Sequence, residues 1–422
     1  MNSKIALTAA LLLAGGVGAA AYAGAQTQRD VQAQLAQMQD TLARSGIATL
    51  KPGPLHKTLM GGTQDTVVTL FPNTPDRLDI TLRSRIHNGP FPQGKSFGAA
   101  RIVTQVIFPP DVQADLDEAF SGQKITLQTQ VQFGGSSVTT YQVPAGQYAE
   151  GDGEMTWRAL SGTVHNRGDR VTATAQWPGA ELRGDGLDLQ VGRLSWDFQG
   201  VQSPDGLGDS ESQFRLERIG GVSGGTRVVL SDLQSKGQVT GDDRHLSSAV
   251  QYRVGQLQVD DRTFDQLRLD LSVDRLDRPA LVRLGQLGSE LDQVPEAELN
   301  RLMTDLLRAA PQFQIDRLSV GEGAEEVVVT GRVGFRPGPG ANWETLILDP
   351  VQLLSTLDVQ AQARTGETGL RQLLGLAMEE HEVQAAIDEG EAMGLFVRRG
   401  DRYEADLRMG SGGTYLNGQP LE

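Results

Sequence analysis

The residues that most resemble a chemical motif run from Gly89 to Ser96, GPFPQGKS. They match G-x-x-x-x-G-K-S letter for letter, the pattern of loops whose backbone N–H groups bind nucleotide phosphates. Two of the four variable positions are Pro90 and Pro92, which have no N–H to donate. The residues after the loop predict a strand, whereas a phosphate loop opens a helix. We therefore interpret the segment as a rigid turn and expect no bound nucleotide.

The other polar side chains form no catalytic or metal-binding constellation. No pair at ligand spacing occurs among His56, His87, His165, His245 and His381. The carboxylates between Asp205 and Glu211 could hold calcium, but they lack the spacing of a calcium loop, and a plain loop is the better interpretation. The chain has no cysteine, which excludes thiol catalysis and Cys-ligated zinc. We predict no catalytic residue, no cofactor and no metal.

The charge of the chain excludes one class of partner. Its 38 basic and 53 acidic residues give a net charge of −15, whereas nucleic-acid binding requires a basic face for the phosphates. We therefore expect no nucleic acid partner. At 422 residues the chain is longer than one compact core usually serves, which predicts two or three lobes or one elongated architecture.

The N-terminus carries an export segment. Lys4 precedes an uncharged run, Ile5–Ala25, that ends in small-x-small sites, the order found in a signal peptide. The run is about 20 residues long, enough to span a bilayer as an uncleaved anchor, and residues 1–25 are therefore a signal peptide or a membrane anchor. Both alternatives predict an extracytoplasmic protein of the periplasm or cell envelope, anchored to the inner membrane or secreted. We expect an amphipathic helix at 26–46, because its apolar residues recur at helical spacing.

From about residue 63 the hydrophobic pattern changes to period two. Short alternating runs such as TVVTLF, ARIVTQVIF and QLRLDLSVDRL are separated by Gly, Pro, Asn and Asp, as expected for antiparallel strands with one buried face. Helical patterns interrupt them at 111–121, with Asp111 as the expected cap, at 295–309, and as a pair near the end of the chain.

These patterns predict an α+β, β-dominated fold. We expect one or more long curved antiparallel sheets, a few packing helices and the N-terminal signal or anchor helix. A β-rich lobe would span 47–290, and a C-terminal α+β lobe at 291–422 would continue the sheet. Three runs share the phrase apolar-x-apolar-x-x-apolar, a weak internal repeat that fits a long curved sheet. These runs are LQVGRL at 189–194, FRLERI at 214–219 and FQIDRL at 313–318.

Two short elements together resemble the YdgA-like family of bacterial envelope proteins, which has no assigned biochemical activity. The first follows a strand and contains His87, Gly89, Pro90, Phe91 and Pro92. The second lies in the C-terminal strands and contains Tyr403, Asn417 and Gly418. Asn88 separates His87 from Gly89, which are usually adjacent in the family. The resemblance implies an extracytoplasmic protein held at the inner membrane, and it implies no catalytic residues.

The sequence therefore indicates a class of function and no specific activity. The leading hypothesis is a non-enzymatic envelope protein that binds or scaffolds at the inner membrane, with a lipid or another envelope protein as possible partner. One alternative is a lipid-binding or lipid-transfer protein with an apolar β-trough, similar to AsmA-like proteins. It requires that the apolar face stay uncovered by the helices at 111–121 and 295–309. A second alternative is a hydrolase of envelope polymers, which needs close carboxylates in a cleft.

Overall fold

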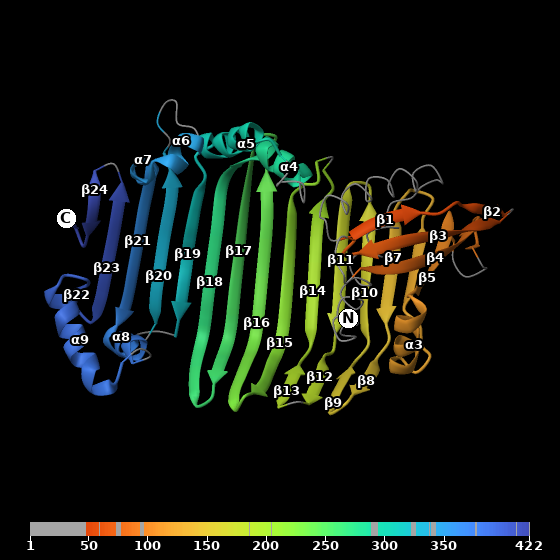
Figure 1. The fold of residues 1–422 in the computed structure, drawn as a ribbon, viewed down its shortest axis with the longest axis horizontal. Helices are drawn as coiled ribbons and strands as arrows, with labels where there is room; N and C mark the ends of the chain where they lie inside the picture. Colours follow the sequence, from red (N-terminus) through yellow and green to blue (C-terminus); the bar gives the residue numbers. More distant parts are fainter. Residues whose placement is uncertain are drawn as a thin grey trace. The chain divides into compact units, whose positions relative to one another are not determined.

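Figure 1 presents the computed structural model of the chain. The structure describes residues 48–422 except 59, 73–76, 93–96, 185, 204, 288–293, 322–325, 337, 339–342, 376, 377, 411 and 422. The predicted signal or anchor at 1–25 and the predicted helix at 26–46 lie outside the described residues. Among the described helices, none combines the length and the apolar character that crossing a membrane requires.

The described chain is β-dominated, with antiparallel strands and a few packing helices, and this confirms the predicted fold class. It divides into two compact units. Unit 1 comprises the described residues up to Gly225 together with Gly285–Leu287, and unit 2 comprises Thr226–Leu284 and the described residues that follow 293. This division rests on contacts within each unit. It does not test the predicted lobes, 47–290 and 291–422, which stay a prediction.

Unit 1 contains fifteen of the described strands and one helix, α3 (Pro110–Ala119). The strands are β1 (Ala48–Pro52), β2 (His56–Thr58), β3 (Gly61–Leu70), β4 (Leu78–Asn88), β5 (Ala100–Ile107), β6 (Thr126–Val131), β7 (Ser137–Val143), β8 (Gly146–Glu150), β9 (Gly153–Trp157), β10 (Leu160–Arg167), β11 (Arg170–Trp177), β12 (Ala180–Gly184), β13 (Leu187–Val191), β14 (Leu194–Val201) and β15 (Ser210–Ser223).

The sheet of unit 1 is antiparallel throughout. Both β1 and β2 pair with β3, and the order then runs β3, β4, β5, β6, β7, β10, β11, β14, β15. The short strands β8, β9, β12 and β13 pair with one another in a second ladder that ends on β15. They lie at one end of the longer strands in Figure 1.

A line of two-residue interruptions, which we name the crease, separates the two ladders. It runs through residues 144–145, 158–159, 178–179 and 192–193 and reaches β15 at 217–218. An interrupted ladder leaves carbonyl groups that need other donors. The indole Nε1 of Trp157 donates to the Pro144 carbonyl oxygen, and that of Trp177 donates to the Arg158 carbonyl oxygen, each at 3.0 Å. Two tryptophans therefore satisfy the backbone where the sheet is interrupted.

The crease and a bulge explain the shared phrase of the sequence. The copies at 189–194 and 214–219 cross the crease, and the copy at 313–318 crosses a register shift between Ile315 and Leu318. At such a site the alternation of side chains between the two faces of the sheet shifts by one residue. The two residues between the second and third apolar positions of the phrase therefore keep all three apolar side chains on one face.

The core of unit 1 lies between the inner face of its sheet and helix α3. Leu116, Ala119 and Phe120 are buried there, and the Phe120 ring packs edge-on against Trp157, with ring centroids 5.8 Å apart. Gly146 permits this approach. A Cβ atom at Gly146 would stand 2.6 Å from the Ala119 carbonyl oxygen and 2.4 Å from the Trp157 ring.

Unit 2 contains the remaining strands and most of the helices. The strands are β16 (Thr226–Gly241), β17 (His245–Val259), β18 (Arg262–Asp277), β19 (Gln312–Val320), β20 (Val327–Phe335), β21 (Leu357–Gly366), β22 (Val397–Arg399), β23 (Arg402–Gly410), β24 (Gly413–Leu416) and β25 (Gln419–Pro420). The helices are α5 (Glu296–Arg308), α6 (Trp343–Leu348), α7 (Pro350–Thr356), α8 (Glu367–Leu374) and α9 (Glu380–Ala392), and α4 (Arg278–Leu287) follows β18.

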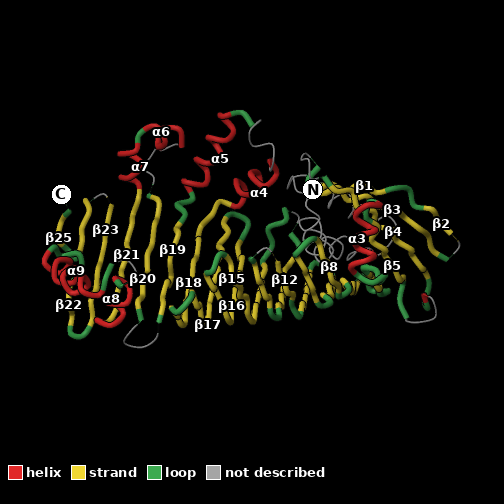
Figure 2. The backbone as a smooth tube through the Cα atoms, turned by 60° about the horizontal axis from the view of Figure 1, so that its bottom comes forward, coloured by secondary structure: helices red, strands yellow, loops and turns green. Residues whose placement is uncertain are grey.

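The sheet of unit 2 is a simple antiparallel meander. Its order is β16, β17, β18, β19, β20, β21, β23, β24, β25, and β22 pairs with the first residues of β23. Figures 1 and 2 place α5, α6 and α7 at one end of these strands and α8 and α9 at the other. The described helices therefore leave the middle of the sheet open.

Candidate binding surface

One face of the unit 2 sheet is apolar from β17 to β23, because the register brings alternate residues of six strands into rows. The middle row is Val250, Leu271, Ile315, Gly331, Ala361 and Leu407. On one side of it lies the row Ser248, Val273, Phe313, Val333, Val359 and Met409. On the other side lies the row Tyr252, Leu269, Leu318, Val329, Ala363 and Ala405. We name these three rows the apolar face.

The apolar face is open to solvent in its middle. Tyr252, Phe313, Ile315 and Leu318 keep 41%, 43%, 37% and 44% of their surface exposed. Single exposed apolar residues are ordinary, but a contiguous apolar patch on a soluble unit marks a binding surface. At one end of the strands the face is covered, because Tyr403 continues it on β23 and packs with Leu370 of α8 and Ile387 of α9. The described residues of unit 2 thus leave the middle of this face exposed, which is the condition that the lipid alternative sets; that alternative stays a prediction.

The reverse face of the same sheet is polar. Its rows carry Gln314, Arg332, Gln360 and Arg408 across β19, β20, β21 and β23. A groove of about 1100 Å³ lies on the β20–β24 part of the sheet. Most of its charged side chains are paired, as in Arg408–Asp406 at 2.8 Å and Arg399–Glu404 at 3.3 Å. The sheet thus separates an apolar surface from a hydrogen-bonding, charged one.

The helices that could have covered the apolar face pack elsewhere. Helix α3, predicted at 111–121, contributes to the core of unit 1. Helix α5, predicted at 295–309, contacts β18 and α6, and its Thr304 Oγ1 accepts a hydrogen bond from the Trp343 N–H at 3.0 Å. Figure 2 draws it at the end of the strands and not across their middle.

The predicted residues His87 to Pro92 lie together in unit 1. His87 is near the end of β4, and Gly89 turns the chain with φ 111°. Pro92 is buried, whereas Phe91 is 65% exposed. The strand predicted after this loop is confirmed as β5, so the first regular element described after the phosphate-like pattern is a strand and not a helix. Residues 93–96, which complete the pattern, lie outside the described residues.

The predicted residues Tyr403, Asn417 and Gly418 lie in unit 2 and have structural roles. The buried Tyr403 ring packs edge-on against Phe396, with centroids 5.4 Å apart, and under the guanidinium of Arg398 at 5.6 Å. Asn417 and Gly418 form the tight turn between β24 and β25, with φ 52° and 80°. The two motif groups thus belong to different units, and each fixes local structure.

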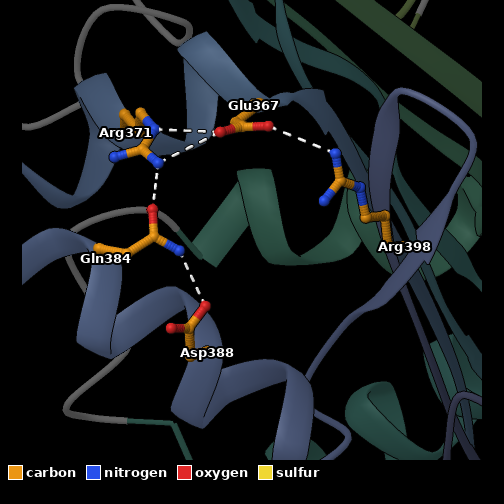
Figure 3. Close-up of polar contacts among 5 residues, drawn as sticks. All are labelled: Glu367, Arg371, Gln384, Asp388 and Arg398. Atoms are coloured by element: carbon orange, nitrogen blue, oxygen red, sulfur yellow. Dashed lines mark hydrogen bonds and ion pairs between the residues drawn. The ribbon is translucent and has the colours of Figure 1, made fainter.

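Figure 3 shows a polar network that holds α8, α9 and β22 together. The Glu367 carboxylate accepts hydrogen bonds from Arg371 at 3.1 Å and from Arg398 at 3.4 Å. Gln384 accepts from Arg371, and its amide nitrogen donates to Asp388 at 2.8 Å. The polar side chains are committed to one another on the surface of the helix pair, so we assign the network to structure and not to catalysis.

The described carboxyl groups with a shifted pKa are all shifted downward, away from what a general acid needs. Such a group needs a carboxyl pKa raised toward neutrality. The hydrogen bond from Arg83 lowers the pKa of Asp65, and that from Lys124 lowers the pKa of Asp117. Burial raises the pKa of Glu326, but hydrogen bonds from Arg317 and Ser319 outweigh it and the pKa is lowered. None of these groups favours the hydrolase alternative.

The described residues also offer no group of three or more metal-ligating side chains. In the acidic loop that could have held calcium, the Asp205 carboxylate accepts hydrogen bonds from Ser203 Oγ at 2.6 Å and from the Leu207 N–H at 3.1 Å. These bonds close a local turn, the role that an aspartate commonly has in a loop.

A family model described as "Bacterial protein of unknown function (DUF945)" matches residues 2–422. The chain belongs to this family. No curated protein and no solved structure matches it significantly. Membership in DUF945 establishes a bacterial family without an assigned function, and it is compatible with the resemblance noted in the sequence.

The sequence of this DUF945 protein suggested an apolar face but did not decide whether it is exposed. Period-two alternation in β17 to β21 predicts one apolar side of a sheet, but it is the same for a covered and an uncovered side. The strand QFQIDRLSV (β19) carries the strongest signal, because Phe313, Ile315 and Leu318 are all large. The exposure of these side chains follows from where the described helices lie and not from the pattern of the strands.

Proposed function

We propose that this chain is a non-enzymatic binding protein of the bacterial cell envelope that holds lipid acyl chains on the apolar face of unit 2. The supporting observation is the exposure of Tyr252, Phe313, Ile315 and Leu318 in the middle of three apolar rows. This proposal joins the binding class that the sequence favours to its lipid alternative. It requires no catalytic residue, cofactor or metal.

The dimensions and chemistry of the face suit an acyl chain. Neighbouring strands lie about 4.8 Å apart, so a row that crosses six strands is about 24 Å long. Each methylene group buried against apolar side chains stabilises binding by about 0.8 kcal/mol. The three rows of the apolar face carry no charged side chain, whereas the groove on the reverse face is lined by charged and polar side chains.

The envelope location is part of the proposal. It is supported by Lys4, the uncharged run Ile5–Ala25 and the YdgA-like elements around His87 and Asn417. An N-terminal anchor would hold the protein at the inner membrane, where its lipid ligands are made available. N-terminal sequencing of the mature protein separates anchor from signal peptide. A start near Gly24 or Gln26 would rule out an anchor.

Photo-crosslinking of the full chain tests the acyl-chain site. A palmitic acid analogue with a diazirine in its chain is bound, irradiated and mapped by peptide mass spectrometry. We expect crosslinks to concentrate in β17–β21. The double substitution Ile315→Lys and Leu318→Lys places two charges on exposed positions of the face, and we expect it to lower the crosslink yield about tenfold.

The matched control is Gln360→Lys, an exposed substitution on the reverse face of β21. We expect it to leave the crosslink yield unchanged. Crosslinks confined to residues 5–25, or equal yields in all three proteins, would contradict the proposal. If no protein crosslinks to the lipid and a dimer dissociates in the double variant, the face is instead a contact between two copies of the chain.

A further inference from the structure

Four large apolar side chains stand exposed at one end of unit 1, and we name them the aromatic tip. They are Met60, Phe91, Phe97 and Phe133, with 68%, 65%, 62% and 58% of their surface exposed. The Phe97 ring contacts both other rings, with centroids 5.6 Å from Phe91 and 5.1 Å from Phe133. The three rings thus form one cluster, although they come from the β4–β5 and β6–β7 connections.

The backbone under the tip is held by hydrogen bonds between its connections. The Asn88 N–H donates to the Met60 carbonyl oxygen at 2.8 Å, and the Gly98 N–H donates to the Pro90 carbonyl oxygen at 3.1 Å. The Ala99 N–H donates to the Val131 carbonyl oxygen at 2.8 Å. The prolines around Phe91 also restrict the turn. The rings are therefore presented outward by a fixed backbone instead of folding onto the sheet.

The strands that carry the tip are basic, in contrast to the whole chain. Residues 48–108 contain seven Lys or Arg and three Asp or Glu, a net charge of +4, while the chain as a whole carries −15. Arg101 lies half-buried beside His87 in the row next to the tip, and the exposed Arg85 lies in the following row. Lys57 on β2 is exposed at the same end. Positive charge is thus concentrated beside the aromatic side chains.

We propose that the aromatic tip inserts into the interface of a bilayer that contains anionic lipid. Phenylalanine and methionine gain free energy when they leave water for the headgroup and acyl boundary, and nearby Lys and Arg attract anionic headgroups. This pairing of apolar tip and basic surroundings is the charge complementarity that the site offers. The proposal does not depend on the acyl-chain site, because the tip lies in unit 1 and the apolar face in unit 2.

A bilayer fits the tip better than a protein partner does. A stable protein interface uses about 20 to 30 residues on each side, whereas the tip has four large apolar side chains. A bilayer interface accepts a small group of exposed rings without a complementary shape. With the expected helix at 26–46, the chain from Ala25 to Ala48 would span about 35 Å, so an anchor at 5–25 is compatible with contact between the tip and the same membrane.

A single fluorescent label tests insertion, because the chain has no native cysteine. Gly134→Cys places a thiol beside Phe133, at an exposed position where a Cβ atom meets nothing within 4 Å. The full chain is labelled there with the environment-sensitive dye NBD and mixed with vesicles of equal parts phosphatidylcholine and phosphatidylglycerol. We expect the emission to rise and shift to the blue as the dye leaves water.

Four comparisons make the insertion test specific. Substituting Phe91→Ser and Phe97→Ser in the labelled protein should lower the vesicle partition coefficient at least about tenfold. Met393→Ser, which changes an exposed methionine of unit 2 outside the apolar face, should leave it unchanged. A label at Asp152→Cys, in the exposed β8–β9 turn, should report no change with vesicles. Salt of about 1 M, where the screening length is about 3 Å, should weaken the partition of the labelled Gly134→Cys protein.

Several outcomes would overturn the proposal. An unchanged emission of the labelled Gly134→Cys protein in the presence of vesicles shows that the tip stays in water. Equal partition into vesicles of phosphatidylcholine alone refutes the role of anionic lipid. The label could also be shielded from water in the absence of vesicles. If the Phe91→Ser and Phe97→Ser variant loses both this shielding and a dimer, a second copy of the chain is the partner. Circular dichroism of each variant confirms that it is folded.

Discussion

At the scale of single residues, Asn417 has the most defined role among the motif residues. Its side-chain oxygen accepts a hydrogen bond from the Asp406 N–H at 2.8 Å, and its amide nitrogen donates to the Gly394 carbonyl oxygen at 2.7 Å. Its φ of 52° is in the left-handed region, where Asn and Gly are favoured. One residue thus ties the end of α9 to β23 and closes the last hairpin.

We therefore predict that Asn417→Ala loosens the C-terminal strands. It loses both side-chain hydrogen bonds and strains the turn, at a cost of about 2 kcal/mol. Local opening should become roughly 30-fold more frequent, measured by hydrogen exchange of peptides from 394–420. Asn417→Gly is the control, because it loses the hydrogen bonds and keeps the backbone relaxed. It should be intermediate. Native exchange in both variants would show that the turn does not hold the strands.

At the scale of elements, the crease distinguishes the sheet of unit 1 from a regular ladder. Trp157 is buried, and its hydrogen bond to the Pro144 carbonyl oxygen is shielded from water. Trp177 makes the same kind of bond to the Arg158 carbonyl oxygen in an exposed setting. The chemistry of the two bonds is alike, and only their burial differs.

This contrast predicts different costs for the same substitution. Trp157→Phe leaves a buried carbonyl group without its donor and removes packing against Phe120, and we expect a loss of about 2 to 3 kcal/mol. In Trp177→Phe, water replaces the indole N–H, and we expect a loss below about 1 kcal/mol. Urea unfolding followed by circular dichroism measures both free energies. Equal losses would mean that burial of the hydrogen bond is not what stabilises the crease.

The elements themselves were largely predictable from the sequence, because their periods are clear. The patterns at 111–121 and 295–309 correspond to α3 and α5, and the helical pair near the end corresponds to α8 and α9. Asp111 as the cap of α3 is wrong. Pro109, with φ −51° and ψ 149°, occupies the cap position because the two prolines fix the chain there, and Asp111 lies in the first turn.

The missed elements had weaker signals. Helix α4 follows β18 without a loop, and its only cue is Asp277 before Arg278 and Pro279. The Asp277 carboxylate accepts a hydrogen bond from the Ala280 N–H at 2.8 Å, as a helix cap does. The crease was visible only as the two-residue gap in LQVGRL and FRLERI. A slip in strand period resembles the end of a strand unless the register of the neighbours is known.

At the scale of the whole molecule, the two candidate surfaces belong to different compact units. Unit 1 packs around Leu116 and Trp157, and unit 2 packs around Ile387 and Tyr403 at the α8–α9 end of its sheet. Neither surface was predictable from the sequence, because exposure depends on which helices cover a face and on how connections meet. From the sequence, the pattern of β19 and the turn at Phe91 identified some of the residues. They did not show which helices or connections lie next to them.

The separation of the cores predicts that the two surfaces act independently. Phe91→Ser with Phe97→Ser should lower vesicle insertion and leave palmitate crosslinking at the apolar face unchanged. Ile315→Lys with Leu318→Lys should do the reverse. In the protein that combines all four substitutions, each effect should equal that of its own pair within about 0.5 kcal/mol, as expected for sites without shared contacts.

Both readouts are measured on the full chain in all four proteins, with free palmitate analogue and with analogue supplied in vesicles. Loss of crosslinking from free analogue in the Phe91→Ser and Phe97→Ser variant would refute independence, because no bilayer takes part in that reaction. If crosslinking is lost only when vesicles supply the analogue, the two sites are still independent. The tip then acts by binding the bilayer from which unit 2 takes its ligand.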